Sequence, residues 1–126
     1  MRKRGIREQL IHQAVVKHLE TRGAPGVVFL HPANGGWRRP TEGAILKSMG
    51  VLKGAPDIFL FHGGRTFALE LKAPGGSITD AQERCLIALR AAGVEATHVH
   101  GLDQAIATLE RWGLLLGRAD LARGAV

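Results

Sequence analysis

Apolar residues near the start of the chain recur at helical spacing and predict an opening helix. Its apolar face consists of Ile6, Leu10, Ile11, Ala14, Val15 and Leu19. Gly23 and Pro25 follow this segment and end the helix. Residues 27–30 are β-branched and aromatic enough for a short strand. Thr41 then caps a predicted short helix that runs to about Met49, with Gly50 ending it.

Two compact apolar runs, 58–61 and 67–71, flank the turn-forming residues 62–66 and predict a β-hairpin. Both runs are apolar at consecutive positions, so we expect both faces of their sheet to be covered. A further helix starts at residues 77–80 and ends at Gly93. Its inward residues are Ala81, Cys85, Leu86 and Leu89. Residues 94–100 predict another strand, and Asp103 caps a last helix that runs to about Trp112.

This order of elements predicts an α/β fold, with a mixed β-sheet flanked by helices. The 126 residues suit one domain, 1–126, with a core at about 6–112 and a C-terminal tail at 113–126. Leucines in that tail either cover the core or form a dimer contact; they are Leu114, Leu115, Leu116 and Leu121.

The formal charge of +6 favours phosphate backbones as partners, although it also keeps any small protein in solution. No apolar stretch approaches the roughly 20 residues that cross a bilayer. The basic residues 1–5 are followed by a segment containing Glu8 and His12 rather than by a signal-peptide core. We therefore expect a cytoplasmic protein with no membrane partner. Cys85 is the only cysteine, which excludes an internal disulfide and favours a buried small hydrophobe.

The predicted hairpin places two acidic residues together. If Gly63 and Gly64 form a two-residue turn, Asp57 lies opposite Glu70, where Cβ atoms are about 5 Å apart and like charges repel. Lys72, two residues after Glu70, projects from the same face. Two carboxylates on a covered sheet need a cation between them, or one must hold a proton. Oxygen ligands favour Mg²⁺ or Mn²⁺ over zinc.

A less specific interpretation is that Asp57 ends a turn and Glu70 pairs with Lys72 at the edge of an exposed hairpin. The run Phe67-Ala68-Leu69-Glu70-Leu71 argues against it, because the run is typical of an interior strand and charged residues are rarely buried without a purpose. The pattern therefore favours a metal-assisted phosphodiester chemistry, in which Lys72 orients water or offsets charge on the phosphate.

Residues 50–58, Gly-Val-Leu-Lys-Gly-Ala-Pro-Asp-Ile, together with Glu70-Leu71-Lys72 and Gln82, closely resemble the VRR-NUC (virus-type replication-repair nuclease) family of the PD-(D/E)XK superfamily. Asn34-Gly35-Gly36 and the helical Glu8 also resemble its pattern, so the resemblance runs from about residue 8 to residue 101. It implies a restriction-endonuclease-like core that uses Mg²⁺ or Mn²⁺ to hydrolyse DNA. Stand-alone members, from phages and bacteria, resemble Holliday-junction resolvases and act as dimers.

The resemblance also implies roles for individual residues. Asp57 and Glu70 would be metal ligands, with the backbone carbonyl of Leu71 as another, and Lys72 matches the motif lysine. Glu8 would be an outer carboxylate that reaches the metal directly or through water, and its place on the helical face of Ile11 and Val15 favours an inward position. Gln82 would lie near the metal, although Thr79-x-x-Gln82 is also a capping box.

A basic loop beside this predicted site is a candidate DNA contact. Trp37-Arg38-Arg39, with Lys47 and Lys53 nearby in sequence, combines cations with an aromatic ring that stacks on bases. Asn34, in the segment that resembles the family, joins this set. The alternative is a packed tryptophan with solvated arginines. Gly50 and Gly54 either admit a phosphate close to the backbone or form a turn.

The histidines give no separate metal signal in the sequence. His98 and His100 share one face of a strand and lack obvious further ligands for zinc. The remaining histidines form no recognisable ligand spacing; they are His12, His18, His31 and His62.

These observations predict an endonuclease for structured DNA, such as Holliday-junction-like or branched DNA, in replication, repair or phage DNA processing. The expected setting is the cytoplasm of a bacterial or phage-infected cell, with a homodimer as the expected assembly. The alternatives are a non-catalytic DNA-binding module with the same fold and a protein that does not bind nucleic acid.

Overall fold

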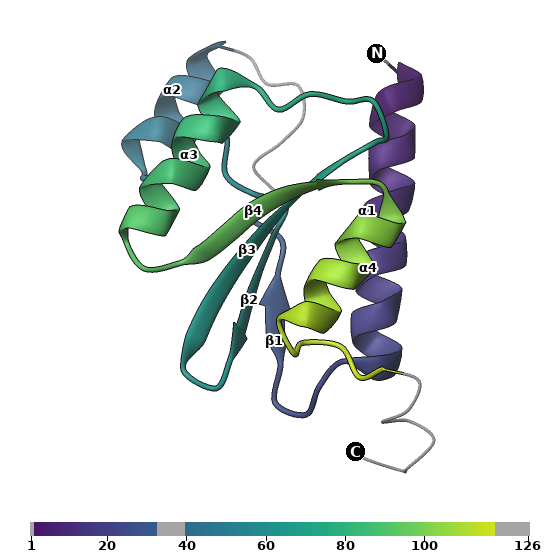
Figure 1. Cartoon of the computed structure of the whole chain (residues 1–126). Coiled ribbons are helices and arrows are strands. Elements are labelled where there is room, and N and C mark those ends of the chain that lie inside the picture. Colours follow the sequence, from purple (N-terminus) through teal and green to yellow (C-terminus); the bar gives the residue numbers. More distant parts are fainter. Residues whose placement is uncertain (1, 33–39, 118–126) are drawn as a thin grey trace.

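A four-stranded sheet lies between helices in the computed structural model, which describes residues 2–32 and 40–117 (Figure 1). The elements in chain order are α1 (Arg2–Arg22), β1 (Val28–Leu30), α2 (Pro40–Ser48), β2 (Ile58–His62), β3 (Arg65–Lys72), α3 (Asp80–Ala91), β4 (Glu95–His100) and α4 (Leu102–Arg111). None of the helices in these residues is long and apolar enough to span a membrane.

The sheet is mixed, with the strand order β1-β2-β3-β4. The pairs β1–β2 and β2–β3 are antiparallel, whereas β3 and β4 are parallel and are joined through α3. A parallel pair needs such a crossover because its strands start at the same edge. The predicted fold class, an α/β structure with a mixed sheet flanked by helices, is confirmed.

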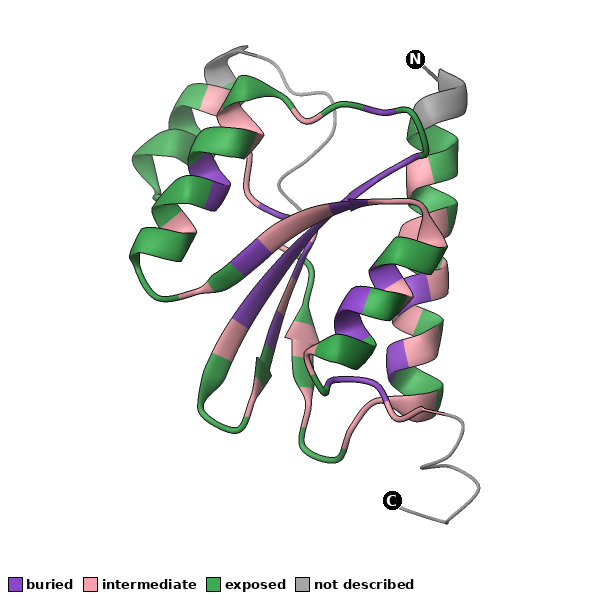
Figure 2. Ribbon diagram, in the orientation of Figure 1, coloured by how far each residue is buried: buried purple, intermediate pink, exposed green. Residues whose placement is uncertain are grey.

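Helices cover both faces of the sheet, as the doubly apolar strands predicted. On one face α1 and α4 pack over the larger apolar cluster, which includes Val15, Leu69 and Leu109. On the other face α3 covers a smaller cluster around Ala68, Leu86 and Ala96. The central strand β3 is therefore buried along most of its length (Figure 2).

The structure corrects two sequence predictions about the helices, one in part and one entirely. Ile6 and Leu10 belong to the predicted apolar face of the first helix, yet they are 57% and 59% exposed. Of the same face, Val15 and Leu19 are buried, because α4 and the sheet pack against the second half of α1 (Figures 1 and 2). Asp103 does not cap α4, since the N-cap is Gly101 and makes no side-chain cap bond.

The segment after α4 closes the core. Leu114 and Leu115 are buried in the larger cluster. The backbone N–H of Leu116 donates to the carbonyl of Arg22, and that of Ala24 donates to the carbonyl of Leu114. These bonds tie the segment to the end of α1. Leu121 lies outside the described residues.

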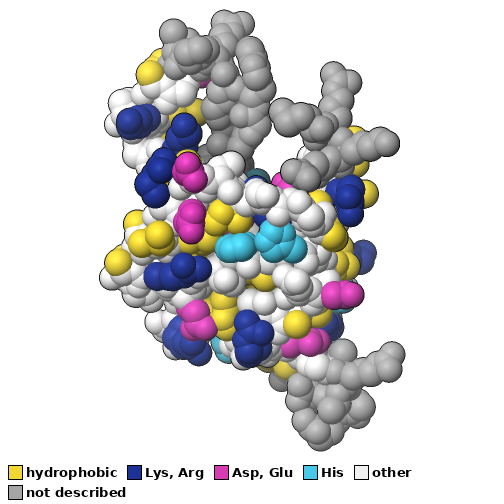
Figure 3. Space-filling view, turned by 45° about the horizontal axis from the view of Figure 1, so that its top comes forward, with side chains coloured by type: hydrophobic (Ala, Val, Ile, Leu, Met, Phe, Trp, Pro, Cys, Tyr) yellow, Lys and Arg dark blue, Asp and Glu magenta, His cyan; other side chains and the backbone are white. Residues whose placement is uncertain are grey.

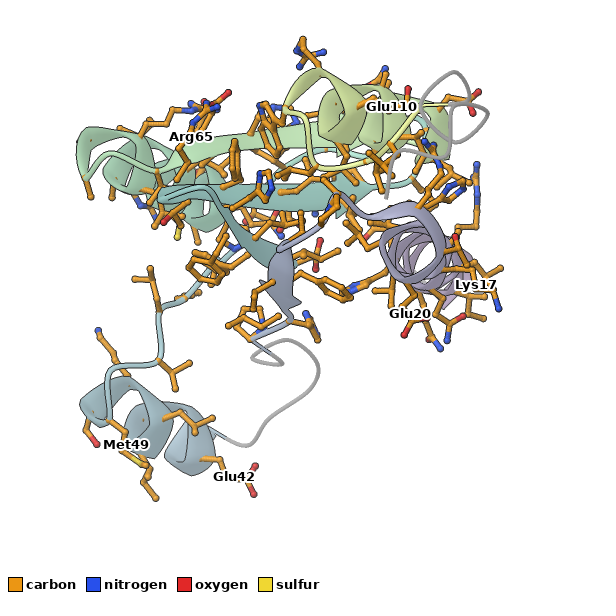
Figure 4. The ribbon with its side chains drawn as sticks, turned by 90° about the horizontal axis from the view of Figure 1, so that it is seen from below. Lys17, Glu20, Glu42, Met49, Arg65 and Glu110 are labelled. Carbon is orange, nitrogen blue, oxygen red and sulfur yellow. The ribbon has the colours of Figure 1, made fainter. Side chains whose placement is uncertain are left out.

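By contrast, α2 stands away from the helix–sheet layers (Figure 4). Met49, just after its end, is 74% exposed. The chain returns from α2 through Gly54, whose φ is +80°. A Cβ at this position would lie 2.6 Å from the backbone carbonyl carbon of Ala81 in α3. Glycine here therefore permits a close approach to α3, immediately before the residues of the candidate site.

Candidate active site

The hairpin register brings the two predicted acidic residues together. Ile58 pairs with Leu69 and His62 pairs with Arg65 around the Gly63-Gly64 turn, as the sequence predicted. Asp57, one residue before β2, therefore lies at the level of Glu70. Its Oδ2 accepts a hydrogen bond of 2.7 Å from the backbone N–H of Leu71. This bond holds the Asp57 carboxylate against β3.

Glu70 is the most strongly perturbed carboxyl of this site. It is 3% exposed, and the Nζ of Lys72 lies 3.6 Å from its Oε2. Burial, followed by repulsion from Asp57, raises the pKa of Glu70 to about 8, while the Lys72 ammonium opposes that rise. A buried carboxyl held among other carboxylates favours a proton or a metal ion as its partner.

Gln82 makes the capping contacts that the sequence predicted and also contacts Glu70. Its backbone N–H donates to the Oγ1 of Thr79, and its Oε1 accepts from the backbone N–H of Thr79, so the capping box is complete. Its Nε2 also donates to Glu70 Oε2 at 3.0 Å. The same side chain therefore fixes the start of α3 and orients the Glu70 carboxylate.

Glu8 approaches this group from α1. Its Oε2 accepts from the backbone N–H of Ala73 at 3.4 Å, just beyond the end of β3. Its negative charge contributes to the raised pKa of Glu70. The inward position that the sequence predicted for Glu8 agrees with these contacts, and three acidic side chains from different elements gather at this end of the sheet.

Two histidines that sequence reasoning left aside lie in the same place. They are His12 and His31, which lie beside Asp57. Each of these three residues offers one possible ligand atom, and the three atoms lie within 4.8 Å of one another. The two imidazole rings meet edge to face, with centroids 4.6 Å apart. Burial lowers the pKa of His12, against the opposing effect of the Asp57 charge. The only local signal in the sequence was the spacing of Glu8 and His12, four residues apart on one helical face.

An open pocket of about 400 Å³ joins these groups. Glu8, His12, His31 and Asp57 line it, together with Gly5, Gln9 and Gln13. Carboxylates and imidazoles thus share one solvent-accessible space next to the buried Glu70, as a metal ion or a phosphate group would require.

His98 and His100 lie on the other side of Glu70. In the parallel register His98 pairs with Glu70 and His100 with Lys72. The shared strand face predicted for the two histidines agrees with their ring centroids, which are 5.2 Å apart. The Nδ1 of His98 is buried and has no hydrogen-bond partner among the described residues. Burial lowers the pKa of His98, which favours the neutral ring.

The predicted DNA-contact loop is only partly described. Asn34, Trp37, Arg38 and Arg39 lie outside the described residues. Lys47 and Lys53 are exposed and line an open pocket of about 700 Å³ at the end of α2. On the face drawn in Figure 3, described basic side chains are interspersed with acidic ones rather than gathered in one patch.

Comparisons with known proteins agree with the fold. A solved structure described as a VRR_NUC domain protein has 24% sequence identity and a TM-score of 0.70, covering 84% of this chain and 87% of that chain. This likeness concerns the fold. A comparison with curated proteins finds no match. The family model of the VRR-NUC domain matches residues 6–103, which is most of the chain. The protein therefore belongs to the VRR-NUC family and has a nuclease-type domain.

Proposed function

We propose that this protein is a metal-dependent endonuclease that hydrolyses DNA phosphodiester bonds. The observation that carries the proposal is the carboxylate pair of Asp57 and Glu70, held together at one end of the hairpin with Lys72 beside it. Membership of a nuclease-type family supports hydrolysis as the reaction.

The donor set fits Mg²⁺ or Mn²⁺. Asp57 and Glu70, with the Leu71 carbonyl and Glu8, offer the oxygen ligands that hard divalent cations prefer. Asp57 and Glu70 would hold such an ion, whose charge would offset the Asp57 repulsion that adds to burial in raising the pKa of Glu70. When bound, the ion polarises the scissile phosphodiester and lowers the pKa of a bound water.

The protein's own side chains prepare this site. Lys72 places a positive charge where the phosphate gains negative charge during hydrolysis. Gln82 donates to Glu70 and so fixes the direction of its carboxylate. We assign Glu8 the role of an outer carboxylate that meets the ion directly or through water.

The test is to incubate the protein with junction, flap, duplex and single-stranded DNA in the presence of Mn²⁺. We expect cleavage of at least one of these substrates, with loss of cleavage in EDTA. Lys72→Met keeps the length of the buried side chain but removes its charge, and we expect it to abolish cleavage. Lys17→Met changes an exposed lysine of α1 and serves as the matched control (Figure 4).

The alternative outcomes separate the competing functions. DNA binding that survives EDTA, without cleavage of any substrate, would identify a non-catalytic DNA-binding module. Cleavage that persists equally in Lys72→Met would refute the assigned site, and would point to a contaminating nuclease.

We further propose that the preferred substrate is branched DNA in replication, repair or phage DNA processing, and that the enzyme acts as a homodimer. A junction with two-fold symmetry suits a dimer with two equivalent sites. Sedimentation equilibrium and competition between junction and duplex DNA test these two proposals. A monomer with equal preference for duplex would contradict both.

The proposed DNA contacts include Asn34, Trp37, Arg38, Arg39, Lys47 and Lys53. Removing one phosphate contact with Arg38→Ala should weaken binding and reduce the dependence of log affinity on log salt by about one. Cleavage at saturating DNA should change little. An unchanged salt dependence would exclude Arg38 as a phosphate contact.

A further inference from the structure

We propose that His12 and His31 form, together with Asp57, a nitrogen-containing site for a first-row transition-metal ion such as Mn²⁺ or Co²⁺. The site adjoins the Asp57–Glu70 pair and shares Asp57 with it. The inference deepens the proposed nuclease function and rests on it for the role of Asp57 as a metal ligand.

The geometry is close to that of a coordination sphere. The ligand atoms of His12, His31 and Asp57 lie within 4.8 Å of one another. Atoms bound at about 2.1 Å from one ion lie roughly 3 to 4.2 Å apart. Binding of one ion by all three residues would require side-chain rotations that close this difference. The three residues come from α1, from the segment after β1 and from the residue before β2, so only the folded chain assembles them.

The tautomer of His31 suits a metal ligand. Its Nδ1 lies 2.5 Å from the backbone carbonyl oxygen of Asp57. A carbonyl only accepts, so Nδ1 carries the proton, and in the neutral ring Nε2 is the nitrogen that is left to bind an ion. Histidines that bind metals commonly donate their other N–H to a carbonyl or carboxylate, because that bond fixes the ring orientation. Asp57 thus offers a carboxylate oxygen as a ligand, while its backbone carbonyl positions the ring of His31.

The surroundings favour entry of an ion. His31 is exposed, whereas His12 and Asp57 are half-buried, and all three line the open pocket of about 400 Å³. Glu8 lines the same pocket and adds negative charge near it. Imidazole nitrogen binds transition metals better than it binds Mg²⁺. We therefore expect His12 and His31 to raise the affinity for Co²⁺ and, to a smaller extent, for Mn²⁺, while contributing little to the affinity for Mg²⁺.

The experiment measures the metal's ligands directly. The full chain, without a polyhistidine tag, is loaded with Mn²⁺ alone and studied by electron spin-echo envelope modulation, which detects ¹⁴N bound to Mn²⁺. We expect imidazole modulation in the unmodified protein and its loss in the double variant His12→Gln/His31→Gln. His62→Gln is the matched control, because His62 lies at the far end of β2 and bonds to the Pro25 carbonyl.

Calorimetry gives a second measurement. His31→Gln alone replaces an exposed side chain, and we expect it to weaken Co²⁺ binding by more than about tenfold while Mg²⁺ binding stays unchanged. Absence of ¹⁴N modulation in the unmodified protein, or its persistence in the double variant, overturns the inference. Equal effects on Co²⁺ and Mg²⁺ also overturn it.

These results are separable from the nuclease proposal. If ¹⁴N modulation is present but no DNA is cut with any metal, the site stands and the nuclease function fails. If DNA is cut in a Lys72-dependent manner while Mn²⁺ has no nitrogen ligand, the nuclease stands and this inference fails.

Discussion

Replacing Glu70 with glutamine should stabilise the metal-free protein while removing its proposed activity. Glu70 is 3% exposed, and burial together with the Asp57 charge raises its pKa from 4.5 to about 8. The folded protein therefore keeps a proton on Glu70 over a range of pH in which the unfolded chain releases it. The contribution of Glu70 to the free energy of unfolding should be full below about pH 4.5 and should fall as the pH rises towards about 8.

The size of the effect follows from these two pKa values. The slope reaches at most about 1.4 kcal/mol per pH unit, and the loss by pH 7 is about 3 kcal/mol. Glutamine has nearly the same shape, stays neutral at every pH and accepts the same bond from Gln82. Near and above pH 8, where Glu70 ionises, glutamine also leaves the buried Lys72 ammonium without a counter-charge, which offsets part of the gain there. We expect a net stabilisation of about 1–3 kcal/mol at pH 7.

The assay is urea unfolding in EDTA at pH 5, 7 and 8, for the unmodified protein and for Glu70→Gln. The difference between the two free energies of unfolding should grow from pH 5 to pH 8. Glu20→Gln is the control, because Glu20 is exposed on α1 away from the sheet (Figure 4). Equal stability of the unmodified protein and Glu70→Gln across this range would refute the argument that Glu70 is buried among uncompensated charges.

Three more predictions follow from the same geometry. Metal binding below about pH 8 should release a proton from Glu70, measurable by calorimetry in buffers with different ionisation enthalpies; a buffer-independent enthalpy would contradict this. Gln82→Ala should lower the free energy of unfolding by about 0.5–2 kcal/mol, because the capping box is lost. It should also slow cleavage, because Glu70 loses its hydrogen bond; an unchanged cleavage rate would leave Gln82 a purely structural role. Gly54→Ala should lower the free energy of unfolding in urea by more than about 2 kcal/mol, because the added Cβ meets the α3 backbone. Gly50→Ala, which has open space around it, should cost only about 1 kcal/mol, and equal effects would contradict the close approach.

The strand pairing at the site was predictable from the sequence because local rules determine it. A two-residue turn at Gly63 and Gly64, both with positive φ, sets the register of the hairpin, and strand alternation then puts Glu70 and Lys72 on one face. The capping box at Gln82 is likewise a relation between residues three apart. Such relations hold wherever the segment lies in the fold.

The burial of the first helix was not predictable from its periodicity. A period of 3.6 residues identifies an apolar face, but it does not say how far that face overlaps the sheet. Ile6 and Leu10 lie on this face and are still exposed, while Val15 and Leu19 are buried.

The sequence by itself determined the order of helices and strands, the mixed sheet, and the hairpin register that places Asp57 opposite Glu70. Only the tertiary structure decided that Glu8 reaches the end of β3 and that His12 meets His31 beside Asp57. Glu8 and Ala73, whose backbone N–H donates to it, are 65 positions apart, and His12, His31 and Asp57 come from separate segments of the chain. Their distances depend on how α1 packs against the sheet, and no spacing along the chain encodes that packing.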